Sequence, residues 1–188
     1  MTTFLLSPAD AGGRRALLLL RPEATFSLAR RLREEGAPLG EVFAFVSGLY
    51  FRGKLVYANR FSRPGSLPLV ITTNRGLIPA HQTITVDDLR GSGTTRISAR
   101  DAGFRGQVAY DAARLPAGRI VLLGSIATSK YVQVLVDVLG DRLMYPEVFE
   151  GMGDMSRGSL LLRHAAEGRE LAYRRVSSLL VGTRRWGT

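Results

Sequence analysis

Three short runs of apolar residues stand out along the chain. They occupy residues 16–20, 69–73 and 120–123. Each run has the length of a strand, is bounded by turn or polar residues, and shows no alternation of apolar and polar positions. Such runs are typical of strands buried on both faces, as in a parallel sheet covered by helices. We therefore predict a buried strand at each of the three positions.

Between these runs, apolar residues recur at the three- and four-residue spacing of helices. The predicted helices follow Pro22 and stop at Gly36, cover the region from Val42 to Tyr57, and occupy residues 101–114, 128–139 and 156–166. Gly48 and Gly53 interrupt the second region, which predicts two helices or a kinked one. Weaker strand patterns lie at residues 83–86 and 142–145 and around Tyr173, and residues 74–79 are predicted to be a loop.

Alternating strand and helix patterns along the whole chain predict an α/β fold. We expect one three-layer domain over residues 1–188, with a mainly parallel central sheet and helices on both faces. No linker or internal repeat divides the chain, and residues 183–188 form a basic tail. No leader or membrane-spanning segment is recognisable, since the run at residues 16–20 is far shorter than the roughly 20 apolar residues that cross a bilayer.

Charge narrows the range of partners. The chain has 26 basic and 16 acidic residues, a formal net charge of +10. A field of this sign attracts nucleic acid, nucleotides or an anionic membrane surface. Only Lys54 and Lys130 are lysines. The excess of arginine fits bidentate phosphate recognition, and it fits a genome rich in G and C equally well.

The chain has no cysteine, which excludes disulfides, thiolate nucleophiles and cysteine-based zinc sites. It also favours a reducing compartment, so we expect a cytoplasmic protein. The two histidines, His81 and His164, lie far apart, and no cluster has the spacing of metal ligands. We therefore expect no metal and no cofactor.

One candidate site follows the strand at residues 120–123. Gly124 and Ser125 lead into a helix that carries Lys130 near its start. Free amides at a helix start can hold a phosphate or carboxylate, and a glycine allows close approach of the backbone. The spacing matches neither a P-loop nor a dinucleotide fingerprint. The alternative is a tight turn in which Ser125 or Thr128 caps the helix.

A second candidate site lies at residues 151–159. Two glycines precede Asp154, Ser156 and Arg157 at the start of an apolar helix. This combination is typical of an anion-binding nest, in which Asp154 could act as a general base or electrostatic stabiliser. The alternative is that Asp154 or Ser156 only caps the helix.

A third candidate site follows the strand at residues 69–73. Asn74 and Arg75 could read a base edge or a phosphate, and Asp87 or Asp88 could activate a water molecule. If these two carboxylates lie on a strand, at most one of them faces a pocket. The alternative is a polar loop followed by a solvated acidic pair.

A fourth candidate is a partner surface at residues 50–61, where aromatic and basic residues are interleaved. Tyr50 and Phe51 could stack on bases while neighbouring cations contact phosphates. Those cations are Arg52, Lys54 and Arg60. The alternative is an amphipathic helix that buries Val56 and Tyr57 and exposes its charges.

The segment Ile120-Val121-Leu122-Leu123-Gly124-Ser125-Ile126-Ala127, followed by a buried helix, resembles the central strand and helix of the uracil-DNA-glycosylase-like superfamily. The resemblance covers the C-terminal third of the chain and implies handling of a base or nucleotide. A later loop of that superfamily, often built around a histidine, contacts the nucleotide. The matching place here holds Met155-Ser156-Arg157-Gly158, without histidine. The superfamily's early water-activating motif has no counterpart in residues 1–50.

These patterns lead to one main hypothesis, a protein that handles a nucleotide, a nucleobase or nucleic acid. Its most specific form is a metal-independent hydrolase of N-glycosidic bonds, and whether the protein is an enzyme stays open. In that form a carboxylate orients water or stabilises positive charge, cations hold phosphate, and an aromatic ring stacks on the base. The assigned residues are Asp154, Asp87 or Asp88 for the carboxylate, Arg75, Lys130 and Arg157 for the cations, and Tyr50 or Phe51 for the ring. The alternatives are a non-catalytic basic module that binds nucleic acid and an assembly subunit that binds an acidic protein.

Overall fold

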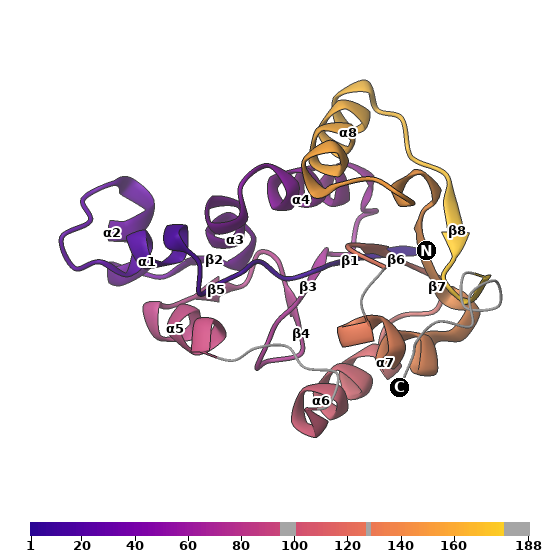
Figure 1. The fold of residues 1–188 in the computed structure, drawn as a ribbon, viewed down its shortest axis with the longest axis horizontal. Helices are drawn as coiled ribbons and strands as arrows, with labels where there is room; N and C mark the ends of the chain where they lie inside the picture. Colours follow the sequence, from indigo (N-terminus) through magenta and orange to yellow (C-terminus); the bar gives the residue numbers. More distant parts are fainter. Residues whose placement is uncertain (95–100, 127–128, 179–188) are drawn as a thin grey trace.

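A computed structural model describes residues 1–94, 101–126 and 129–178. These residues form a six-stranded sheet with the spatial order β4-β3-β1-β6-β7-β8 (Figure 1). The strands are β1 (Thr2–Leu6), β3 (Leu69–Ile71), β4 (Leu77–Pro79), β6 (Arg119–Leu123), β7 (Leu143–Pro146) and β8 (Tyr173–Arg175). A separate antiparallel pair joins β2 (Ala37–Pro38) to β5 (Thr83–Ile84).

The four inner strands of the large sheet are parallel. Strand β1 pairs with β3 on one side and with β6 on the other, and β6 pairs with β7. The edge strands β4 and β8 run antiparallel to their neighbours. The interior of β1 is buried on both faces, because Leu5 packs into one hydrophobic core while Phe4 and Leu6 pack into the other. The mainly parallel central sheet predicted from the sequence is thus confirmed.

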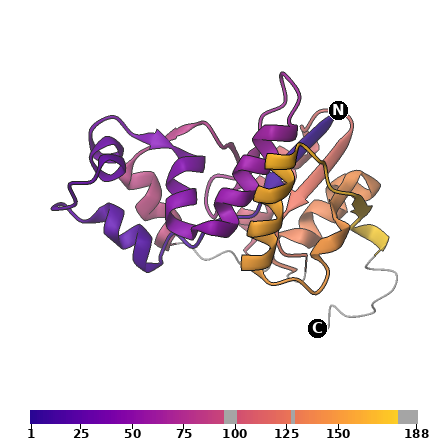
Figure 2. The same cartoon turned by 90° about the horizontal axis from the view of Figure 1, so that it is seen from above.

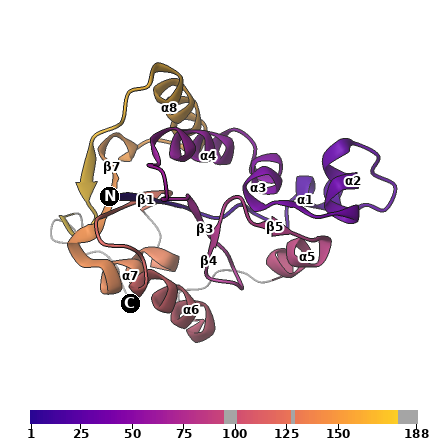
Figure 3. The same ribbon diagram turned by 180° about the vertical axis from the view of Figure 1, so that it is seen from behind.

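Helices cover both faces of the sheet, as predicted. Helices α4 and α8 lie on one face, and α6 and α7 lie on the other (Figures 1 and 3). The remaining helices form a lobe beyond the end toward which β1 runs. The helices are α1 (Arg14–Leu20), α2 (Ser27–Glu34), α3 (Leu39–Ser47), α4 (Leu49–Phe61), α5 (Val86–Thr94), α6 (Ala102–Ala113), α7 (Ser129–Leu139) and α8 (Asp154–Glu167), with 3₁₀ turns at Gly140–Arg142 and Glu147–Phe149.

Most of the predicted elements are confirmed with small shifts at their ends. The strands expected at residues 69–73 and 120–123 are β3 and β6, and those at residues 83–86 and 142–145 are β5 and β7. The expected break within the second helical region falls at Gly48, whose φ of 67° is favourable only for glycine. The helix expected from residue 156 begins two residues earlier, at Asp154.

The strand predicted at residues 16–20 is wrong, because this segment belongs to helix α1. Ala16 and Leu19 are buried while Leu17 and Leu18 are exposed, which is the one-sided burial of a surface helix. Four of the helices and strands were not predicted: β1, β2, β4 and α5, and β4 lies within residues 74–79, where the prediction of a loop is therefore wrong. The first of these is the centre of the sheet, so the sequence pattern missed the most buried strand of the fold.

The predicted basic tail at residues 183–188 lies outside the described residues, as does Thr128. In the part of the chain that the structure describes, no helix combines the length and the apolar character needed to cross a bilayer.

Candidate functional site

A topological switch point lies between β1 and β6, where the connections from the two neighbouring strands lead to opposite sides of the sheet. The chain leaves β1 toward β3 on one side, through helices that include α4, and it leaves β6 toward β7 on the other side, through α7. In open α/β sheets, the carboxyl ends of two such neighbouring strands form the usual ligand-binding crevice. Ser7 follows β1 here and Gly124 follows β6, and the amide of Ser7 donates to the carbonyl of Leu123 over 3.2 Å.

Lys54 of α4 reaches this position from one face of the sheet. Its side chain is only 1% exposed, and its Nζ lies 2.7 Å from the carbonyl oxygen and 2.8 Å from the Oγ of Ser7. The Nζ also lies 4.6 Å from the ring centre of Tyr50 and 4.7 Å from that of Phe51. Burial lowers the pKa of Lys54 to about 7, and the carboxylate of Asp154 opposes this shift.

Tyr131 of α7 reaches the same position from the opposite face. Its Oη donates to the carbonyl of Ser125 over 3.1 Å, and its pKa is raised to about 12, mainly by burial and against a hydrogen bond with Ser7. A Cβ added to Gly124 would lie 2.6 Å from Cβ and 2.9 Å from Oγ of Ser7, and 3.2 Å from Oη of Tyr131. A glycine is therefore required where the two hydroxyl groups approach the end of β6.

Helix α8 contributes a second buried cation. Arg157 is 8% exposed, and its Nη2 donates to the carbonyl of Phe149 over 2.9 Å. Its Nη1 lies 3.4 Å from Oδ1 of Asp154, a carboxylate whose side chain is 67% exposed. Among residues 1–94, 101–126 and 129–178, neither Nε of Arg157 nor Oη of Tyr50 makes a hydrogen bond of normal geometry, although both atoms are buried. The pKa of Tyr50 is raised, mainly by burial.

Helices α4 and α8 pack side by side (Figure 2), and their backbones come into direct contact. A Cβ built on Gly53 would lie 2.6 Å from the carbonyl oxygen of Gly158, and one built on Gly158 would lie 2.9 Å from Cα of Tyr50. Backbone contact of this kind requires glycine on both helices. Lys54 follows one of these glycines and Arg157 precedes the other, so the crossing holds both side chains at the end of the sheet.

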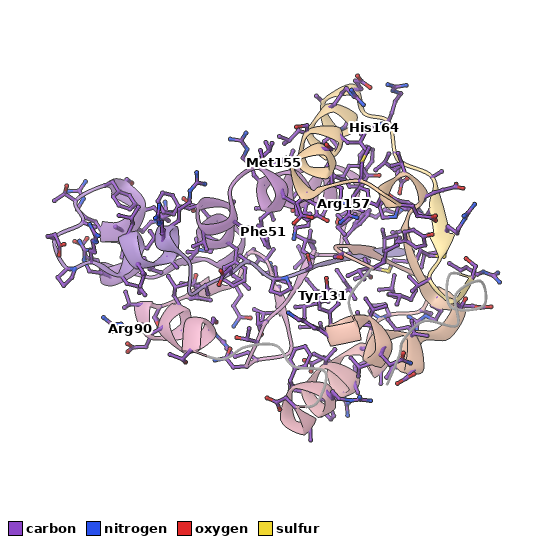
Figure 4. All side chains as sticks on the ribbon, in the orientation of Figure 1. Phe51, Arg90, Tyr131, Met155, Arg157 and His164 are labelled. Atoms are coloured by element: carbon purple, nitrogen blue, oxygen red, sulfur yellow. The ribbon has the colours of Figure 1, made fainter. Side chains whose placement is uncertain are left out.

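We name this group the switch-point cluster. It consists of Ser7, Tyr50, Lys54, Tyr131, Asp154 and Arg157, with Gly124 as the close-contact position. Figure 4 shows Arg157 and Tyr131 extending from α8 and α7 toward the sheet from its two faces, while Met155 and His164 lie on the outer part of α8. The cluster holds two buried cations against one largely exposed carboxylate, which suits it to an anionic ligand.

Five predicted residues are thus brought together from three separate segments of the chain. They are Tyr50, Lys54, Gly124, Asp154 and Arg157. Ser7 and Tyr131 were not predicted, because residues 2–6 show no clear strand pattern and no polar motif marks either residue. A run of Thr, Phe and Leu that ends at Ser-Pro would have been the signal for this strand.

The predicted residues around the end of β3 form a different group. Nη1 of Arg75 lies 2.9 Å from Oδ1 of Asp88, and the other oxygen of Asp88 accepts hydrogen bonds from the amide and hydroxyl of Thr85. The amide of Asp88 donates in turn to Oγ1 of Thr85, so the two residues form a capping box at the start of α5. Asp87 is exposed and pairs with Arg90 over 3.0 Å. The premise that the two carboxylates lie on a strand is wrong, since both lie in the first turn of α5.

The aromatic side chains of residues 50 and 51 do not lie on the surface, so the predicted stacking surface at residues 50–61 is wrong. Phe51 is fully buried and Tyr50 nearly so, because both rings pack into the core beneath α4. The alternative was an amphipathic helix that buries Val56 and Tyr57 and exposes its charges. It is wrong for two residues, since Val56 is exposed and Lys54 is buried. Arg52 is exposed, as expected.

The remaining predicted residues lie near the cluster or outside it. Ser125 is half-buried beside Tyr131, and Lys130 is exposed on the first turn of α7. Asn74 is exposed after β3, with its Nδ2 close to Gly91 of α5. Ser156 is exposed and lines a shallow hollow along α8 with Met152, Met155, Ser159, Leu160 and Arg163. Within the described ranges, no group of three or more His, Asp or Glu side chains could hold a metal ion.

Comparison with protein-family models, curated proteins and solved structures finds no match to this chain.

Proposed function

We propose that this protein binds a nucleotide and that the switch-point cluster holds its phosphate. The observation that carries the proposal is that two buried cations, Lys54 and Arg157, lie against the same side chain, Tyr50, and that Lys54 contacts Ser7 at the carboxyl end of β1. This is the position at which open α/β sheets bind their ligands, and phosphate groups of nucleotides are frequent occupants there.

The energetics of the cluster favour an anion. A buried ammonium group without an anionic partner is costly, which is why the pKa of Lys54 is lowered to about 7. The nearest carboxylate, on Asp154, is engaged with Arg157 and is itself exposed to solvent. A phosphate beside Lys54 would stabilise its charged form, and the buried Nε of Arg157 is a further donor for such a group.

The catalytic form of the proposal is hydrolysis of an N-glycosidic bond without a metal. Water would attack the anomeric carbon, the carbon–nitrogen bond would break, and its electron pair would leave with the base, which takes up a proton. Asp154 would orient the water or stabilise the positive charge that develops on the sugar. The resemblance of residues 120–127 to the uracil-DNA-glycosylase-like superfamily supports this choice of reaction.

Binding is tested by calorimetry with AMP, UMP, their nucleosides and inorganic phosphate, on the wild type and on Arg157→Gln. The matched control is Arg163→Gln, which removes an exposed arginine from the same helix. We expect a nucleotide to bind more tightly than its nucleoside, and Arg157→Gln to weaken binding at least tenfold, since a hydrogen bond to a charged group contributes about 1.5–3 kcal/mol. Equal affinity in both variants, or no binding to the wild type, contradicts the proposal. Chromatography of the same samples detects any released base.

A second candidate function rests on the outer face of α4 and α8. These helices lie side by side and expose Arg52, Arg60 and Arg163. Such a face suits the backbone of nucleic acid bound without catalysis, and its affinity would fall steeply with salt. For this function Arg163→Gln is the test variant and Arg157→Gln is the control. Arg163→Gln should weaken oligonucleotide binding measured by fluorescence anisotropy, while Arg157→Gln should leave it unchanged.

A further inference from the structure

Ser7 and Lys54 are in direct contact at the centre of the switch-point cluster. Ser7 stands at the carboxyl end of β1, a strand with parallel neighbours on both sides, and Lys54 enters from α4. The Oγ of Ser7 and the Nζ of Lys54 are 2.8 Å apart, within the reach required of a nucleophile and its general base. Oη of Tyr131 also lies near the side chain of Ser7, and it donates its own proton to the carbonyl of Ser125.

We propose that Ser7 is a nucleophile activated by Lys54, and that the cluster can transfer an activated carboxylic acyl group through a covalent serine ester. Serine–lysine pairs on unrelated folds use the same division of roles. This nucleophile shares its position with the nucleotide site but does not depend on it, because it is defined by the contact between Ser7 and Lys54 alone.

Nζ of Lys54 lies within donating distance of both the carbonyl oxygen and Oγ of Ser7, and the same two distances are compatible with a neutral amine. An amine has two N–H donors and one lone pair. The carbonyl oxygen of Ser7, 2.7 Å from Nζ, can only accept, so it takes one N–H. The lone pair can then accept the hydroxyl proton of Ser7. Burial supports this state, since it lowers the pKa of Lys54 to about 7 and leaves a large neutral fraction at physiological pH.

The chemical step follows from this contact. Lys54 takes the proton of Ser7 as Oγ attacks the acyl carbon, the bond to the leaving group breaks, and the leaving group takes its electron pair and the proton from Lys54. Water then hydrolyses the serine ester with Lys54 again as base, which regenerates Ser7 and releases a carboxylic acid. Arg157, which belongs to the same cluster, is available for an anionic part of the substrate.

The charged and titratable groups near Lys54 lie on helices α4, α7 and α8. Asp154 of α8 favours the protonated amine, whereas burial disfavours it and is the larger effect. Arg157 lies on the same helix as Asp154. The pKa values of the Tyr50 and Tyr131 hydroxyls are raised, so neither tyrosine titrates near neutral pH. The reactivity of Ser7 is therefore expected to follow the titration of Lys54.

The test is labelling of the full chain with a fluorophosphonate, which reacts with activated serines by loss of fluoride. Peptide mass spectrometry locates the adduct. On the wild type we expect Ser7 to be labelled at least ten times faster than any other serine, at a rate that rises with pH through about 7 and then levels off. Ser7 retains 7% exposure, so the probe should carry a short, linear alkyl group.

Variants then separate the two roles. Ser7→Ala should abolish the adduct, and Lys54→Met should slow labelling about a hundredfold, the lower range of general-base catalysis. The matched control, Ser159→Ala, alters an exposed serine and should keep the wild-type rate. A wild type that is not labelled at Ser7, or whose rate is independent of pH, overturns the inference. Both of these results come from the unmutated protein, so a variant that fails to fold does not weaken the test. Since the probe contains no nucleotide, its failure leaves the nucleotide-binding proposal to be judged by calorimetry.

Discussion

Replacing Lys54 by Met should remove a specific pH dependence from the stability of this protein. The folded state lowers the pKa of Lys54 from 10.5 to about 7, mainly because the side chain is buried. Between these two values the unfolded chain binds more protons at this site than the folded chain does. The free energy of unfolding must therefore rise with pH across this window, and the contribution is absent in the Met variant.

The size of the effect follows from the shift. One pKa unit corresponds to about 1.4 kcal/mol, so raising the pH from 7 to about 9.5 should stabilise the wild type by roughly 3 kcal/mol relative to Lys54→Met. The measurement stops below pH 10, because tyrosines such as Tyr131 have raised folded pKa values and lower the stability when the unfolded chain loses their protons. Above their ordinary pKa of 10, the two effects would oppose each other.

Urea unfolding of both proteins at half-unit pH intervals measures the difference directly. Lys130→Met is the matched control, since Lys130 is the other lysine of the chain and is exposed. The control should follow the wild type at every pH. If the wild type and Lys54→Met give parallel curves between pH 7 and 9.5, burial does not destabilise the charged amine, and the reasoning from burial to a lowered pKa of Lys54 is refuted.

Two further pairs of substitutions test the contact between α4 and α8 and the start of α5. Gly53→Ala should destabilise the protein by about 1–3 kcal/mol, because the new Cβ would lie 2.6 Å from the carbonyl oxygen of Gly158. Gly106→Ala in α6 has nothing within 4 Å of its added Cβ and should be neutral or stabilising in the same thermal unfolding assay. Asp88→Ala should cost about 1 kcal/mol by removing the cap of α5, whereas Asp87→Ala, at an exposed position, should change stability by less than about 0.5 kcal/mol. Equal effects within either pair would show that the assigned contact is not the cause.

Local residue patterns were sufficient to predict those helices and strands whose environment is the same on all sides. Residues 120–123 are buried on both faces of the sheet, so an unbroken apolar run predicts their strand correctly. The break at Gly48 was equally predictable, since the positive φ there is a property of glycine itself. The run at residues 16–20 misled because four leucines fit a strand or a helix, and only the one-sided burial of α1 distinguishes the two.

In the candidate site, too, some features could be predicted from local patterns and others depend on the tertiary structure. The residue patterns alone indicate an α/β protein of strong positive charge in which glycine-rich polar segments follow the strands. It did not determine which of those segments meet. Lys54 reads as one cation of a surface helix until the structure places its Nζ on Ser7, 47 residues away. That contact depends on the order of strands in the sheet and on the crossing of α4 with α8 at Gly53. Both result from packing between distant parts of the chain, which no local pattern of residues contains.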